Sequence, residues 1–185
     1  ARRVELADAM IGLALVEAER TDNPHSTARV MDLLGGKAVY TPLSPFLCQT
    51  KALGFDAPVE QGHLERLEKF YFKRDTPAQI VVTPYTHNSV LSEASQRGFV
   101  AEEFEQLLWL NLDADTARQC SDVLQNCAEA GLEVRPLTQE DRQQWALMID
   151  AGFADRDDWP EEDQDGFAPL FRLWTTMPMF HGHMA

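Results

Sequence analysis

One stretch of the chain, residues 79–112, constrains the fold more than any other because its local signals agree. Residues 80–83 form a β-branched run that predicts a buried strand. Asn88 is placed to cap a following helix, and Gly98 is placed to end that helix in the left-handed conformation. Residues 107–110 are apolar on both faces, as expected of a strand inside a covered sheet. The stretch therefore predicts a strand, a helix and a second strand.

Two helical patterns precede this stretch. Residues 4–20 predict a helix that presents Leu6, Met10 and Leu13 on one face and glutamates on the others. Residues 60–73 predict the clearest helix of the chain, because an apolar stripe and a charged face alternate throughout it. Both stripes predict packing against a sheet or against another helix.

A glycine pair lies between these two helices. Gly35 and Gly36 predict a turn that opens a short strand over residues 37–41, and residues 46–53 are expected to be extended as well. The pair is not a phosphate-binding loop, because it precedes a strand and lacks the Gly-Lys-Ser/Thr ending.

Composition sets the outer limits of the interpretation. With 185 residues, 44% hydrophobic and 25% charged, the chain matches an ordinary globular protein of one domain or two small ones. It has no apolar run of membrane length and no secretory signal pattern at its start, so a cytoplasmic location is expected. The formal net charge of −14 argues against nucleic acid and anionic membranes as partners.

Cysteine and histidine spacing gives little support for a metal site. Cys120 and Cys127 are seven residues apart on one predicted helix face, which favours reduced core thiols, and Cys48 adds an odd third thiol. His181 and His183 could chelate a metal, but two histidines without a third ligand are insufficient. We expect no metal site.

A second set of signals begins at residue 113. Asp113 or Asp115 is expected to cap a helix that Gly131 ends. Residues 133–141, Glu-Val-Arg-Pro-Leu-Thr-Gln-Glu-Asp, then predict a strand that runs into another helix, with Thr138 and Asp141 as a near capping box. That next helix has an apolar stripe and ends near Phe153; the stripe contains Trp145, Met148 and Ile149.

Two of these segments resemble the GNAT superfamily, the acyl-CoA-dependent N-acetyltransferases. Asn88 followed ten positions later by Gly98-Phe99 resembles the late motif of that family, although Ala94 stands where the family often has a tyrosine that serves as general acid. Residues 133–153 resemble the opening strand and first helix of a GNAT domain. The strand after Gly35 also resembles the N-terminal lobe of a two-lobed subgroup.

The order of the two motifs implies tandem lobes, because the late motif precedes the opening motif. On this interpretation residues 1–112 form a degenerate GNAT-like lobe, residues 113–132 a linking helix, and residues 133–185 the start of a second, incomplete lobe. The expected fold class is α/β (α+β), with a GNAT-like mixed sheet flanked by helices. A resemblance limited to strand–helix turns shared by many α/β proteins is the remaining alternative.

The resemblance implies acetyl-CoA as co-substrate and an amine as acceptor, but the site residues are mostly missing. The family's pyrophosphate motif, Arg/Gln-x-x-Gly-x-Gly/Ala at a strand-to-helix junction, is absent from the chain. Asn88 is the candidate that remains for cofactor binding. The acidic segment 155–165, with Asp155, Asp157 and Asp158, is the candidate for binding a basic acceptor, although a solvated acidic loop is the simpler interpretation.

The last nineteen residues are rich in large apolar side chains. These side chains require a covering layer, which could be the first lobe, a second subunit or further chain beyond Ala185. Two functions follow: the N-terminal part of a two-lobed GNAT-like N-acetyltransferase, or a non-catalytic GNAT-like module that binds a ligand or a protein partner.

Overall fold

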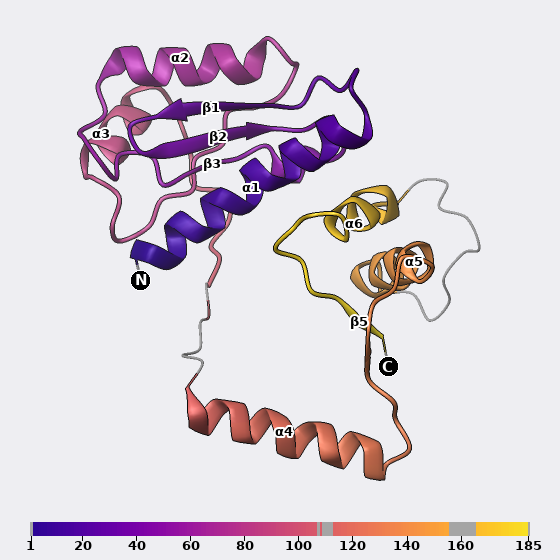
Figure 1. Ribbon diagram of the computed structural model, residues 1–185. Helices are drawn as coiled ribbons and strands as arrows, with labels where there is room; N and C mark the ends of the chain where they lie inside the picture. The colour runs from indigo at the N-terminus through magenta and orange to yellow at the C-terminus, as the bar shows by residue number, and fades with distance from the viewer. Residues whose placement is uncertain (1, 107, 109–112, 156–165, 185) are drawn as a thin grey trace. The chain divides into compact units, whose positions relative to one another are not determined.

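The computed structural model describes residues 2–106, 108, 113–155 and 166–184. The chain divides into two compact units, Ala1–Phe104 and Glu105–Ala185, which are described separately. Together they give a mixed α+β fold, in agreement with the expected class at this level (Figure 1).

The first unit is built on a three-stranded antiparallel sheet. Strands β1 (Arg29–Leu33), β2 (Gly36–Tyr40) and β3 (Thr50–Lys51) lie in the order β1-β2-β3, with the 3-10 helix η1 (Pro45–Leu47) before β3. Leu34 and Gly35 join β1 to β2 with φ angles of 49° and 83°. Positive φ at both central residues is the geometry of a tight hairpin whose twist matches the strands, which confirms the predicted turn.

Helices cover the two faces of this sheet. On β2, Val39 packs with Val16 of helix α1 (Arg2–Asp22), whereas its neighbour Ala38 belongs to the core that includes Leu64 of helix α2 (Gln61–Phe72). Successive strand residues point to opposite faces, so α1 and α2 lie on opposite sides of the sheet (Figure 1). The predicted helices over 4–20 and 60–73 are confirmed.

The buried face of α1 differs from the prediction. Met10 is 44% exposed, and the side that approaches the sheet includes Gly12 and Val16. A Cβ atom on Gly12 would lie 2.7 Å from Cγ2 of Val39, so the missing side chain lets the helix lie close to β2. The apolar spacing of α1 fits more than one stripe, and the prediction selected the stripe that contains Met10.

The predicted strand over residues 80–83 is reduced to one parallel bridge between Ile80 and Thr50. Thr50 donates its N–H to Gln79 O at 2.9 Å, and Val81 donates its N–H to Thr50 O at 2.9 Å. Helix α2 therefore connects β3 to a parallel neighbour, and the pairing of the unit is mixed. The strand is short because β3, its partner, has only two residues.

Helix α3 (Ser89–Gln96) completes the first unit and ends at Gly98, whose φ of 79° confirms the predicted left-handed stop. Arg97 holds it to α2 by donating from Nε to Glu68 Oε1 at 2.8 Å and from Nη2 to Glu68 Oε2. This guanidinium lowers the pKa of the Glu68 carboxyl. The extended segment expected after Phe99 forms no strand within residues 99–106, and most of residues 107–112 lie outside the described part of the chain.

A buried carboxylate ties α1 to the loops on either side of the β1–β2 hairpin. Glu19 is 4% exposed. Its Oε1 accepts a hydrogen bond from Ser26 Oγ at 2.5 Å, and its Oε2 accepts one from Thr41 Oγ1 at 2.5 Å. Ser26 Oγ in turn accepts the Ala28 N–H at 3.0 Å. Both carboxylate oxygens are therefore satisfied where water is excluded.

The second unit contains α4 (Ala114–Glu129), β4 (Arg135–Pro136), α5 (Arg142–Phe153), α6 (Ala168–Trp174) and β5 (His183–Met184). The side chain of Asp113 accepts N–H groups of Asp115 and Thr116, so Asp113 is the predicted cap of α4. The prediction that Cys120 and Cys127 are core thiols is wrong for Cys120, which is exposed, while Cys127 is half-buried. No residue of α4 is buried, so the helix face that carries Cys120 is not part of a core.

The apolar C-terminal stretch finds part of its cover inside its own unit. Ala168 and Phe171 of α6 join Trp145, Ala146 and Leu147 of α5 in one hydrophobic cluster. Phe180 packs edge-on against Trp145, with ring centroids 5.1 Å apart. Helix α5 is therefore one covering layer for these residues, while Phe167 and Met179 keep about half of their surface exposed (46% and 50%).

Replacing Glu19 by Ala should destabilise the first unit by about 2 kcal/mol or more, because two buried hydroxyl groups lose their acceptor. Urea unfolding followed by circular dichroism measures the change. Glu17→Ala is the matched control, since Glu17 lies on the same helix with an exposed side chain. Equal stability of the two variants would contradict a structural role for the buried carboxylate.

Candidate functional site

The N-terminus of α3 is where the sequence placed the cofactor candidate. Asn88 has helical backbone angles, φ −56° and ψ −25°, and its side chain makes no capping hydrogen bond. His87 does the capping instead: its Nδ1 accepts the Ser89 N–H at 3.2 Å, and its carbonyl oxygen accepts the Val90 N–H at 2.9 Å. Asn88 therefore stands at the predicted N-cap position, but its side chain does not cap the helix, because His87 Nδ1 accepts the first N–H.

Ser89 fastens this helix end to the loop before α2. Its Oγ accepts the Val59 N–H at 2.7 Å and lies 2.9 Å from His87 Nδ1. The Ser89 N–H also points at His87 Nδ1, so this nitrogen acts as an acceptor. The Ser89 hydroxyl therefore donates a hydrogen bond to His87 Nδ1. Gly54 permits the close fit, since a Cβ there would lie 2.8 Å from Val90 Cγ2. The serine and histidine thus act as structural hydrogen-bonding partners.

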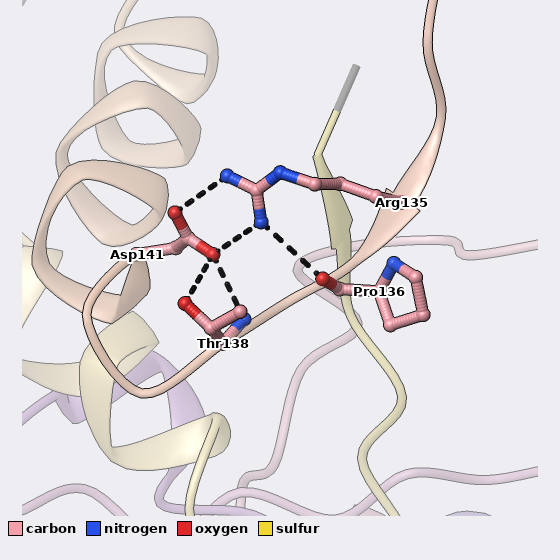
Figure 2. A network of polar contacts seen from close by, with 4 residues as sticks. All are labelled: Arg135, Pro136, Thr138 and Asp141. Atoms are coloured by element: carbon pink, nitrogen blue, oxygen red, sulfur yellow. Dashed lines mark hydrogen bonds and ion pairs between the residues drawn. The ribbon is translucent and has the colours of Figure 1, made fainter.

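A second arrangement of polar groups lies at the junction between β4 and α5 (Figure 2). Arg135 donates from Nη1 to Asp141 Oδ2 at 2.5 Å and from Nη2 to Oδ1 at 2.7 Å. Thr138 donates to Oδ2 twice, from its N–H at 2.8 Å and from its Oγ1 at 2.6 Å. One carboxylate therefore receives four hydrogen bonds from two residues, Arg135 and Thr138.

These donors hold Asp141 ionised. Hydrogen bonds from Arg135 and then from Thr138 lower the pKa of the Asp141 carboxyl far below its usual range. The hydrogen bonds to Asp141 in turn raise the pKa of the Arg135 guanidinium. A carboxylate that is so strongly held cannot take up a proton near neutral pH, so Asp141 is unsuited to act as a general base.

The Asp141 network closes the turn between β4 and α5. Strand β4 is antiparallel to β5, with Arg135 opposite Met184 and Pro136 opposite His183. One hydrogen bond of the predicted near capping box is present, because Asp141 accepts the Thr138 N–H, but α5 begins only at Arg142, so the pair lies in the turn before the helix. The role of Arg135 was not predicted, although its place six residues before an acidic helix start could have suggested an ion pair.

One of the acidic candidates for acceptor binding lies just after the end of α5. Asp155 follows this helix with a φ of 51° and is exposed, whereas Asp157 and Asp158 lie outside the described residues. Asp150, which the sequence analysis did not select, is buried (3% exposed), and its Oδ1 accepts the Phe167 N–H at 2.7 Å. Acceptor binding by Asp155 therefore stays a prediction, while Asp150 joins α5 to the residue before α6.

The described part of the chain contains no group of three or more His, Cys, Asp or Glu side chains placed to hold a metal ion. Within the same residues, no helix combines the length and the apolar composition needed to span a bilayer. Comparisons with known protein families, with characterised proteins and with solved structures found no match.

Replacing Asp141 by Asn should lower the midpoint of thermal unfolding at pH 7, because the ion pair with Arg135 is lost. The pKa of Asp141 is lower in the folded than in the unfolded chain, so its stabilisation is present above the unfolded value of about 3.9 and is lost as pH falls below it. The difference in midpoint between the two proteins should therefore shrink from pH 7 to pH 3.

Glu140→Gln provides the control for this measurement, since Glu140 is an exposed neighbour. A difference between wild type and Asp141→Asn that stays constant across this pH range would show that the carboxylate charge is not what stabilises the junction.

Proposed function

We propose that the chain is the N-terminal part of a two-lobed GNAT-like N-acetyltransferase, with acetyl-CoA as co-substrate and an amine as acceptor. The observation that carries the proposal is the β4–α5 junction. The residues that resemble the opening of a GNAT domain form a strand, a tight turn and a helix, and Arg135, Thr138 and Asp141 bond to one another there.

The first unit gives secondary support through its mixed pairing. An antiparallel sheet with a parallel bridge at Ile80, enclosed between α1 and α2, is compatible with a mixed sheet flanked by helices. Its α3 ends at Gly98-Phe99, where the late motif of the family places the end of a helix.

The N-terminus of α3 does not fit the pyrophosphate group of CoA. Such a group is held by free N–H donors at a helix N-terminus, often with basic side chains nearby. At α3 the Ser89 N–H is bound to His87 Nδ1 and the Val90 N–H to the His87 carbonyl oxygen. We therefore derive no reaction step from these residues.

A non-catalytic GNAT-like module is the second candidate function. The absence of the family's pyrophosphate motif from the sequence favours it, and so do the N–H donors at α3 that His87 occupies. The net charge of −14 agrees with either proposal, since it attracts a cationic amine or a basic protein partner.

Two measurements on the native protein distinguish the proposals. Its intact mass, taken from the source cell, should exceed the 20.9 kDa of this chain if a second lobe is completed. Protein of that native mass should then release the CoA thiol from acetyl-CoA when primary amines are added. Tertiary amines are the matched control, because they lack the N–H that acetylation replaces.

A native mass of 20.9 kDa without amine-dependent thiol release would overturn the acetyltransferase proposal. Calorimetric titration of that protein with acetyl-CoA then tests the module: binding without turnover supports a ligand-binding role. ATP serves as the comparison polyanion, and equal heats from both compounds would indicate general anion binding only.

A further inference from the structure

Helix α4 carries an apolar face on which no residue is buried. The face runs along the helix and its cap, and Val123 and Leu124 at its centre are 59% and 54% exposed. Its members are Ala117, Cys120, Val123, Leu124, Cys127 and Ala130. Exposed apolar residues that gather on one helix face mark an interaction surface more often than scattered ones do.

The charged residues of α4 lie away from this face. Helix α4 has four charged residues, Asp115, Arg118, Asp122 and Glu129. Because an α-helix turns by about 100° per residue, these four fall within an arc of roughly 60° on the side opposite the apolar face. The borders of the apolar face are formed by the uncharged Gln119, Ser121 and Asn126. A second copy of this acidic chain could therefore approach without placing like charges against one another.

The apolar face is also symmetric along its length. Its midpoint lies between Val123 and Leu124, and Cys120 and Cys127 are equally far from that point on either side. Ala117 and Ala130 flank them in the same way. Two antiparallel copies related by a two-fold axis at the midpoint would thus place small residues opposite small ones and Val123 opposite Leu124, which is the self-complementarity that such an interface requires.

We propose that α4 is a homodimerisation surface, on which a second copy of the chain binds antiparallel about an axis between Val123 and Leu124. In this dimer Cys120 of each copy lies opposite Cys127 of the other. The two cysteines of one helix are about 10 Å apart along its axis, beyond the roughly 7 Å limit between the Cα atoms of a disulfide. An added two-electron thiol oxidant, which takes up the two electrons while the two thiol protons are released, therefore joins Cys120 of one chain to Cys127 of the other.

Sedimentation velocity of the full chain over a range of concentrations tests association directly. The wild type should form a dimer as concentration rises, and Leu124→Asp should raise the dimer dissociation constant at least about ten-fold, since each copy loses a buried leucine. Gln125→Asp is the matched control: it adds the same charge at the next residue, on the opposite side of α4, and should leave the constant unchanged.

Mild oxidation tests the direction of the pair. Wild-type protein should give disulfide-linked dimers in which peptide mass spectrometry finds Cys120 joined to Cys127, while Cys120→Ser and Cys127→Ser should each lose the cross-link. Cys48 should not compete, because it is buried and desolvation raises the pKa of its thiol.

A wild type that stays monomeric at every concentration would overturn the proposal, as would equal effects of Leu124→Asp and Gln125→Asp on association. If Leu124→Asp lowered stability in a protein that is always monomeric, the face would be covered within one chain. Cross-links that persist in both single-cysteine variants would mean a parallel pair and would overturn the antiparallel arrangement.

Discussion

The position of α1 on the sheet depends on the buried carboxylate of Glu19. Removing a carboxylate from water costs several kcal/mol unless hydrogen bonds replace the lost hydration. Ser26 and Thr41 supply these bonds from the loop before β1 and from the end of β2. Because the three groups come from separate segments, the carboxylate is satisfied only when helix, loop and strand end meet. Gly12 then decides how closely α1 approaches β2.

The sequence was most informative where one local cause determined the structure. The helix over residues 60–73 and the left-handed conformation of Gly98 are confirmed. Residues 60–73 have one apolar stripe, which fits only one buried helix face, and Gly98 adopts positive φ without steric cost. Strand β1 was not predicted, since its sequence contains polar residues. It pairs with β2 because the Leu34–Gly35 turn brings the two strands together. The strand over 80–83 was overestimated, because β-branched residues indicate extended backbone but not the length of the partner that pairs with it.

The candidate site shows the same division. The hydrogen bond from the Thr138 N–H to Asp141 could be predicted, because it depends on two residues three positions apart. The ion pair with Arg135 could not, since it depends on the direction in which β4 enters the turn. Asn88 was chosen by residue preference for helix starts, but His87 offers an acceptor closer to the first N–H of α3. Residue preference alone does not distinguish neighbouring candidates for one cap.

Three helix N-termini among the described residues bind side chains of this chain, which bears on what ligand the protein can take. Glu60 and His63 form a capping box on α2, His87 caps α3, and Asp113 accepts two N–H groups of α4. An incoming phosphate would have to displace these acceptors against a net charge of −14, which adds an electrostatic penalty to the lost hydrogen bonds. A cationic amine meets neither obstacle. CoA would therefore need donors supplied by residues other than these three helix ends.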